Sequence, residues 1–149
     1  MSRRYSIAGT RAVASPTKSL LGLTSAATIR PRLYDIIMGS TATPADNALE
    51  FLLQRYTAVG TGTGVTPTAL DPADPAALAS GTAAHSVEPT YTAGAVLLDI
   101  AQNQRSTQRW VAAPGSELVL PATANNGVGL QPINASFTGN VLATFLFEE

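Results

Sequence analysis

Residues 141–147 read V-L-A-T-F-L-F, and this stretch decides the fold. Successive side chains of a β-strand point to opposite faces, so the stretch sorts into two faces, Val141, Ala143, Phe145 and Phe147 against Leu142, Thr144 and Leu146. Aromatic and aliphatic residues in this alternation are typical of a strand. Both faces are largely apolar, so one can line a core while the other meets a second subunit. The candidate subunit-interface residues are Leu142, Leu146 and Phe147.

Similar short runs recur outward from this stretch, separated by turn residues. We expect about eight strands, near residues 3–9, 19–24, 32–38, 49–56, 95–101, 107–112, 117–120 or 128–133, and 140–147. Pro114-Gly115 and Asn125-Asn126-Gly127 mark turns, because Asn and Gly tolerate a positive φ. Short strands at this spacing predict an antiparallel sandwich, and eight strands in two sheets is the jelly-roll number. The sequence therefore predicts an all-β, antiparallel, jelly-roll-like β-sandwich.

Two of these runs need a choice. In residues 32–38, Asp35 interrupts one face, so Tyr34, Ile36 and Met38 are expected to point inward. Residues 49–56 are also compatible with a helix, because the preceding T-P-A-D at 43–46 resembles a helix start. We favour a strand there, since aromatic and Thr residues favour strands.

The middle third, from about 57 to 89, is expected to leave the sheets as a long loop or short-helix excursion. Residues 60–64 read G-T-G-T-G, whose side chains are too small to fill a core, which predicts a loop or a loose edge segment. Asp74 fits a helix N-cap, Pro75 the first helical position and Gly81 the stop, so one or two helical turns are expected. His85, the only histidine, is interpreted as a loop residue.

Charge is distributed unevenly along the 149 residues. Six of the nine Lys and Arg residues lie in the first 32 residues, which contain no acid, so this segment carries +6 and the remainder −7. Within a single domain, we therefore distinguish a basic N-terminal arm with early strands (1–32) from the sandwich (33–149). Such an arm suggests docking to an acidic partner or a neighbouring subunit. The alternative interpretation is that these residues are solvated strand and loop positions.

The inventory of reactive residues argues against an enzyme. The chain has no Cys and one His, which excludes a thiolate nucleophile and a zinc site of ordinary type. No G-x-S-x-G elbow is present, and the glycines at 60–64 lack the G-x-G-x-x-G spacing. We therefore predict no catalytic, cofactor-binding or metal-binding residues. A net charge of −1 and the absence of an apolar run of about 18 residues predict no nucleic-acid partner and no membrane span.

Three C-terminal segments carry a resemblance to a known family. They are V-A-A-P-G-S-E-L-V-L-P at 111–121, N-G-V-G-L-Q-P at 126–132 and the closing strand at 139–148. Together they resemble the C-terminal half of the small decoration (cement) proteins of tailed-bacteriophage heads. The resemblance covers about a quarter of the chain, and its motifs are short.

This resemblance implies a structural virion protein that oligomerises, with a trimer as the expected state, on the exterior of an icosahedral capsid assembled in the host cytoplasm. Its partner would be the major capsid protein shell, whose neighbouring subunits it would bridge and stabilise. The basic arm could then meet acidic residues of the shell. The candidate capsid-docking residues are Arg3, Arg4, Arg11, Arg30 and Arg32.

A second function is compatible with the same fold. A jelly roll on a virion or cell surface can bind carbohydrate or a receptor, with Trp110, Tyr91 or the loop at 57–68 as the binding element. This alternative predicts an exposed aromatic platform. The competing interpretation is that the single Trp belongs to the core.

Overall fold

The computed structural model describes residues 2–13, 18–133 and 137–149, and within them the chain forms twelve strands. The first six are β1 (Arg4–Val13), β2 (Leu21–Thr24), β3 (Arg32–Thr41), β4 (Ala48–Ala58), β5 (Thr61–Val65) and β6 (Thr68–Ala69). The others are β7 (Ser80–Val87), β8 (Thr90–Asn103), β9 (Gln108–Val111), β10 (Leu118–Val119), β11 (Gly127–Pro132) and β12 (Gly139–Glu148). Every segment that the sequence predicted as a strand lies in or overlaps one of these.

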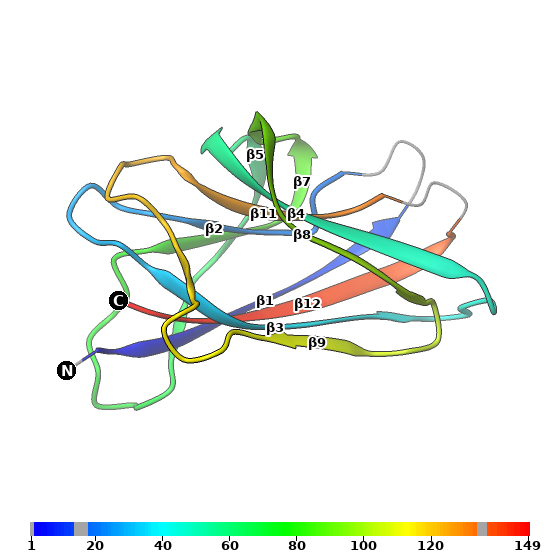
Figure 1. Ribbon diagram of the computed structural model, residues 1–149, viewed down its shortest axis with the longest axis horizontal. Coiled ribbons are helices and arrows are strands. Elements are labelled where there is room, and N and C mark those ends of the chain that lie inside the picture. The colour runs from blue at the N-terminus through cyan, green and yellow to red at the C-terminus, as the bar shows by residue number, and fades with distance from the viewer. Residues whose placement is uncertain (1, 14–17, 134–136) are drawn as a thin grey trace.

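The strands form two antiparallel sheets of six that pack face to face. Sheet A has the order β10-β3-β12-β1-β6, with β9 also paired to β3, and sheet B has the order β5-β7-β2-β11-β4-β8. Figure 1 shows sheet A as the lower layer and sheet B as the upper one. The predicted all-β antiparallel sandwich is therefore confirmed.

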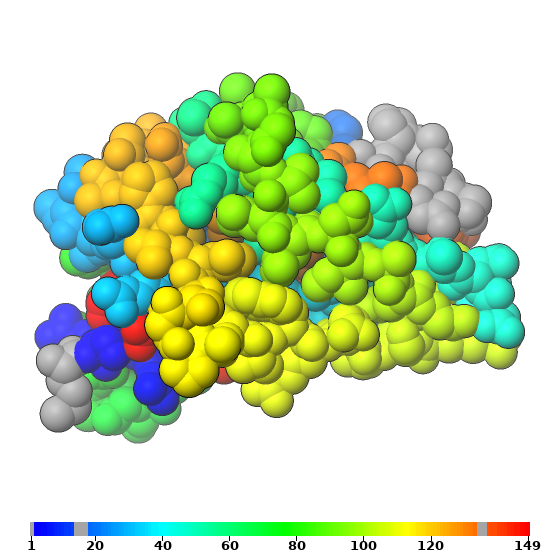
Figure 2. Space-filling view, viewed as in Figure 1, coloured from blue at the N-terminus to red at the C-terminus, as the bar shows by residue number. Residues whose placement is uncertain are grey.

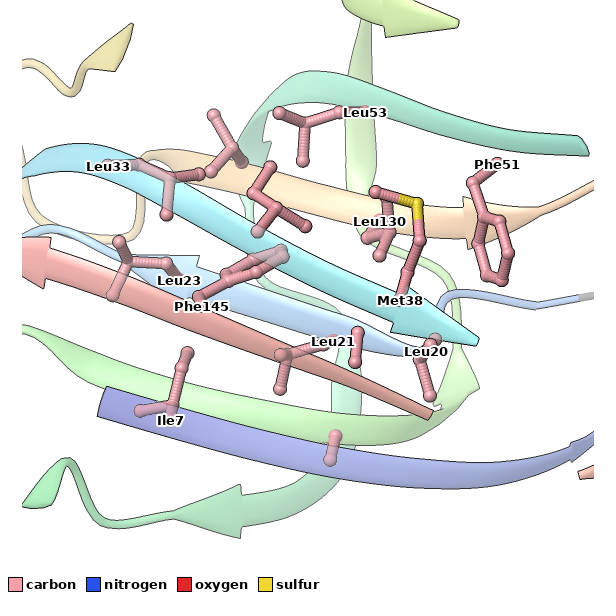
Figure 3. Close-up of a cluster of buried hydrophobic side chains, with 14 of the residues drawn as sticks. Ile7, Leu20, Leu21, Leu23, Leu33, Met38, Phe51, Leu53, Leu130 and Phe145 are labelled. Atoms are coloured by element: carbon pink, nitrogen blue, oxygen red, sulfur yellow. The ribbon is translucent and has the colours of Figure 1, made fainter. Parts of the chain in front are cut away.

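The closing strand β12 lies at the centre of sheet A, between β1 and β3. Its inward face is fully buried, with Phe145 opposite Ile7 on β1 and Ile36 on β3. Leucines from sheet B pack against this face across the sandwich (Figure 3). Phe147 belongs to the same face and stacks on Tyr5 with ring centroids 5.6 Å apart. The prediction of Phe147 as an interface residue is therefore wrong, because this side chain has no exposed surface that a partner could contact.

An irregularity in β3 changes which of its side chains point inward. The pairing with β12 runs from Asp35 opposite Leu146 directly to Leu33 opposite Phe147, so Tyr34 is an extra residue in β3. A β-bulge of this kind reverses the alternation of faces. Leu33 and Ile36 are consequently both buried, whereas Tyr34 is half-buried on the outside. The inward orientation predicted for Tyr34 is wrong, while that of Ile36 and Met38 is confirmed.

The middle third is not an excursion of loop and helix. Strand β5 forms one edge of sheet B, which confirms the edge alternative for the Gly/Thr run, and β7 lies inside that sheet between β5 and β2. Residues 70–79 form a loop without a helix, and Gly81 lies within β7, so the predicted helix and its stop are wrong. His85 is a fully buried strand residue of β7, and its interpretation as a loop residue is also wrong.

The N-terminal segment is integrated into both sheets. Strand β1 pairs along its whole length with β12, from Arg4 opposite Glu148 to Val13 opposite Gly139. Strand β2 pairs with both β7 and β11 in sheet B. The predicted early strands are therefore present, but residues 4–13 and 21–24 are not an arm separate from the sandwich.

Candidate docking surface

Four of the five candidate docking arginines line hollows that residues from both ends of the chain share, and Figure 1 shows these two chain ends at one end of the sandwich. Arg3 and Arg4 line a hollow of about 580 Å³, and Arg30 and Arg32 line a second one of about 370 Å³. Ser2 contributes to both hollows, so the two are neighbours. We call the surface formed by Arg3, Arg4, Arg30 and Arg32 the terminal surface.

Acidic residues line the terminal surface in equal number, with Asp71 and Asp74 in the first hollow and Glu148 and Glu149 in the second. The guanidinium of Arg3 lies 3.9 Å from the Asp74 carboxylate, and that of Arg32 lies 3.7 Å from Glu148. Both arginine side chains are more than half exposed, and ion pairs of exposed groups contribute little to stability. Arg4 lies over the ring of Tyr34, 5.9 Å from its centroid. The arginines therefore stay within reach of a partner.

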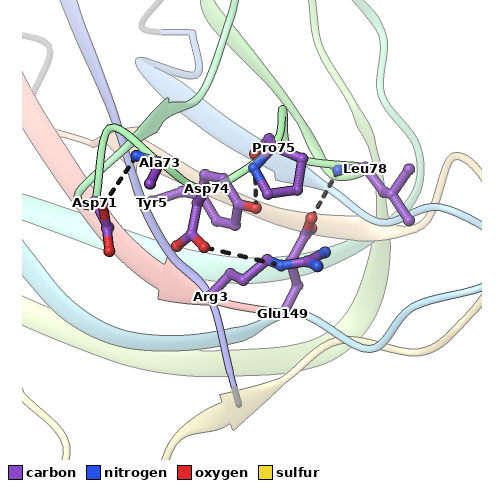
Figure 4. Close-up of polar contacts among 8 residues, drawn as sticks. All are labelled: Arg3, Tyr5, Asp71, Ala73, Asp74, Pro75, Leu78 and Glu149. Carbon is purple, nitrogen blue, oxygen red and sulfur yellow. Dashed lines mark hydrogen bonds and ion pairs between the residues drawn. The ribbon is translucent and has the colours of Figure 1, made fainter.

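The loop 70–79 is fixed to this end by polar contacts (Figure 4). The Tyr5 hydroxyl donates to the Pro75 carbonyl at 3.0 Å. The backbone N–H groups of Leu78 and Ala79 donate to the Glu149 carboxylate at 2.7 and 3.1 Å. Leu78 itself is 61% exposed, so the loop presents an apolar side chain beside the terminal surface.

The outer face of sheet A carries the other two candidate interface residues. Leu142 and Leu146 are half-buried and point away from the core, on either side of Thr144. Thr144 lies opposite Ala8 on β1 and Ile37 on β3, which share this face. The face therefore carries aliphatic side chains interspersed with small hydroxyl-bearing ones, since Ser6 lies opposite Leu146 and Thr10 opposite Leu142.

One ion pair interrupts this face. Asp35 has only 3% of its surface exposed. Arg109 on β9 donates hydrogen bonds to its carboxylate, from Nε to Oδ1 at 3.0 Å and to Oδ2 at 3.1 Å, and from Nη2 to Oδ2 at 2.5 Å. The Arg109 side chain is 61% exposed and covers the carboxylate. Hydrogen bonding and the charge of Asp35 raise the pKa of Arg109. The pair keeps a buried negative charge compensated on this face.

A hollow of about 260 Å³ connects the terminal surface with the outer face of sheet A. Its lining includes Arg4, Tyr34, Val111, Glu117 and Glu148. Val111 is 54% exposed. The Glu117 carboxylate accepts a hydrogen bond from the Gly115 N–H at 3.0 Å, and backbone hydrogen bonds lower its pKa. Aliphatic, aromatic and charged groups are thus continuous from one surface to the other.

Arg11 does not join the terminal surface. Its Nη1 donates to the carbonyls of His85 at 2.5 Å and Ser19 at 3.4 Å, so it ties β1 to β7 and to the segment before β2. Burial lowers its pKa, with Glu88 opposing the shift. This arginine has a structural role within the sandwich.

The outer face of sheet B is covered by its own side chains, which the sequence analysis did not anticipate. Tyr91 lies on Gly129, where an added Cβ would meet its hydroxyl at 2.3 Å, and Tyr56 lies on Gly127, where an added Cβ would meet its ring at 2.5 Å. The two rings contact edge to face with centroids 6.3 Å apart. Burial raises the pKa of both tyrosines. The feature of the sequence that could have indicated this packing is the alternation of glycines in β11.

Hydrogen bonds fix this aromatic layer. The Tyr91 hydroxyl shares a hydrogen bond of 2.5 Å with Ser19 Oγ, which donates at 2.7 Å to the Glu88 carboxylate. Trp110 lies on the other sheet, half-buried against the core. Tyr91 and Trp110 therefore do not form one platform. Residues 57–58 end β4 and residues 61–65 form β5, so the loop predicted at 57–68 is mostly strand.

Comparisons with protein-family models, with curated proteins and with solved structures found no match. Among the described residues, no group of three or more His, Cys, Asp or Glu side chains is arranged to hold a metal ion. In the same part of the chain, no helix has the length and apolarity that crossing a bilayer requires.

Proposed function

We propose that the protein is a structural virion protein that decorates the exterior of an icosahedral phage capsid and stabilises it by bridging neighbouring shell subunits. The major capsid protein shell would be its partner, and assembly would take place in the host cytoplasm. This function requires no bond to be made or broken. Binding that occurs only in the assembled shell stabilises that shell by mass action.

The order of the strands supports a jelly roll as the finer fold. Strands β5, β6 and β7 are inserted between β4 and β8. The remaining pairs are nested: β1 with β12, β2 with β11, β3 with β9 and β4 with β8. A long hairpin rolled across two sheets has this nested pairing. Jelly rolls are common in viral capsid and lectin domains, which makes a virion role reasonable.

The observation that carries the proposal is the terminal surface with the outer face of sheet A beside it. Four arginines there would meet acidic residues of the shell, and complementary charge directs docking more than it adds affinity. The aliphatic face around Leu142 and Leu146 would bury area between copies of the chain, with a trimer as the expected state.

A binding assay tests the docking surface. Shells of the encoding phage that lack the protein are mixed with the wild type, with an Arg4→Gln/Arg32→Gln double variant and with a Lys18→Gln/Arg105→Gln control. Both variants change the net charge equally, and Arg105 follows β8 at the opposite end from the chain termini (Figure 1). Weaker cosedimentation of the first variant alone, with a steep loss in added salt, is expected.

Equal binding of the two variants would remove the terminal surface from the mechanism, and no binding of the wild type to shells would overturn the proposal. A glycan panel in parallel tests the alternative, carbohydrate or receptor binding. The lectin-like strand order favours that alternative, but the positions of Tyr91 and Trp110 on separate sheets give it no platform.

A further inference from the structure

A separate hollow of about 340 Å³ opens at the edge of the sandwich, between its two sheets. Val119 lines it from β10 of sheet A, and Arg55, Thr92 and Gly127 line it from β4, β8 and β11 of sheet B. Arg30, from the segment before β3, closes one side. In Figure 2 the orange segment lies between the light-blue and the green ones on the face in view. Its volume suits a small ligand.

The lining of this hollow carries positive charge, although Arg30 also lines the terminal-surface hollow that contains Glu148 and Glu149. Arg30 and Arg55 both line it, and none of its lining residues is acidic. Across the described part of the chain, neither arginine forms an ion pair. Arg55 is half-buried and uses one Nη1 donor on the Val119 carbonyl at 3.0 Å. Two guanidinium groups in one recess repel each other unless an anion lies between them.

The rest of the lining supplies neutral hydrogen-bonding groups and apolar walls. Thr57, Thr92 and Asn126 line it, and the Thr57 hydroxyl donates to the Thr90 carbonyl at 3.5 Å. The Tyr56 hydroxyl is engaged with Thr24 Oγ1 at 2.7 Å, so its ring serves as a wall. Pro121 adds a second apolar wall. Guanidinium donors with hydroxyl and amide groups around them are the chemistry that recognises several oxygens of one anion.

We propose that this hollow is an oxyanion-binding site, in which Arg30 and Arg55 together hold a carboxylate or phosphate group. The planar fork of a guanidinium matches the two oxygens of either group. Arg55 is positioned by the Val119 carbonyl, while Arg30 approaches from an exposed segment. The inference concerns the isolated protein and does not rest on the proposed capsid function.

Titration of the isolated protein tests this site. The melting temperature is measured against inorganic phosphate and, separately, succinate, with sodium chloride at matched ionic strength as the reference. A saturable rise with phosphate or succinate is expected, because a ligand bound only by the folded state stabilises it. The anion that produces the rise identifies the ligand as phosphate or carboxylate.

Arginine variants then locate the binding. Arg30→Gln and Arg55→Gln are each expected to weaken the affinity by roughly tenfold or more, since each removes a charge-assisted contact. Arg105→Gln is the matched control and should leave the affinity unchanged. Arg30 lies outside the strands, so its variant remains informative if Arg55→Gln does not fold. A response no larger than that to chloride, or one that survives Arg30→Gln unchanged, would overturn the proposal.

Discussion

At the residue scale, glycines on the outer face of sheet B make room for aromatic rings. Gly127 and Gly129 lie in a strand at the middle of the sheet, where glycine is normally unfavourable. Here the missing side chain lets the rings of Tyr56 and Tyr91 lie directly on the backbone. The layer is therefore specified by what β11 lacks as much as by the tyrosines themselves.

Replacing Gly127 by Ala tests this. Its Cβ would lie 2.2 Å from the Leu23 carbonyl oxygen and 2.5 Å from the Tyr56 ring, so the free energy of unfolding should fall by about 1–3 kcal/mol. Gly64→Ala is the control, because an added Cβ there meets nothing within 4 Å, and its effect should stay within about 0.5 kcal/mol. Urea unfolding followed by tryptophan fluorescence measures both. Equal losses would contradict the close packing.

His85 makes stability depend on pH. Burial lowers the pKa of His85, opposed by the backbone of Ser19 and Val59 and by Glu88, and assisted by Arg11. Below about pH 6.5 the unfolded chain binds a proton that the folded protein binds less readily, so stability should fall as pH falls from there.

The measurement is the free energy of unfolding between pH 7.5 and 5. The wild type should lose stability across this range, and His85→Gln, which carries no titrating group, should lose less. Carboxylates titrate mainly below this window. The same slope for both proteins would show that His85 does not titrate differently on folding.

At the element scale, the sequence pattern failed to predict the orientation of one side chain in β3 and the existence of strand β7. Ile36 and Met38 follow the predicted alternation of inward and outward side chains. The bulge at Tyr34 reverses that alternation for the preceding residues, and no residue type in the sequence indicates the bulge. Strand β7 has Gly81, Ala83 and Ala84 where a strand usually carries larger side chains, so its sequence resembles a loop. Its place is set by pairing with β2 and β5, which a single sequence does not reveal.

The loop 70–79 depends on its contacts with the last residue of the chain. Glu149→Ala removes the acceptor for the N–H groups of Leu78 and Ala79, so hydrogen exchange at these two amides should accelerate while global stability falls by only about 1 kcal/mol. Exchange followed by mass spectrometry resolves the loop. Glu117→Ala, which removes a similar contact to Gly115, should leave the loop unchanged. Unaltered exchange in Glu149→Ala would mean that other contacts hold it.

At the scale of the whole molecule, the two faces of β12 should respond differently to substitution. Leu142→Glu/Leu146→Glu places charges on the outer face, so the solution mass should fall to that of a monomer while the circular dichroism spectrum is retained. Phe147→Ala instead removes a fully buried ring and should cost about 3–5 kcal/mol of stability. Analytical ultracentrifugation and thermal unfolding separate these results. A wild type that is already monomeric would refute the interface.

Some features of the candidate docking surface could be predicted from the sequence, and others could not. The sequence located the basic residues of the terminal surface and the apolar pattern of β12, because charge and alternation are local properties. It could not show that Arg11 lies apart, since its partners are His85 on β7 and Ser19 in the segment before β2. Nor could it show that Arg30 and Arg55, which are 25 positions apart, line one hollow. Such groupings depend on strand order across both sheets.

The pairing of β1 with β12 has a consequence for how the protein is made. Strand β1 cannot complete its pairing until β12 has been synthesised, because β12 fills the gap between β1 and β3. Contacts so distant along the chain slow folding, and the nascent chain exposes the facing edges of β1 and β3 until β12 is available. We expect the growing polypeptide to be vulnerable to aggregation over that interval, and premature termination within residues 139–148 to leave sheet A without its central strand.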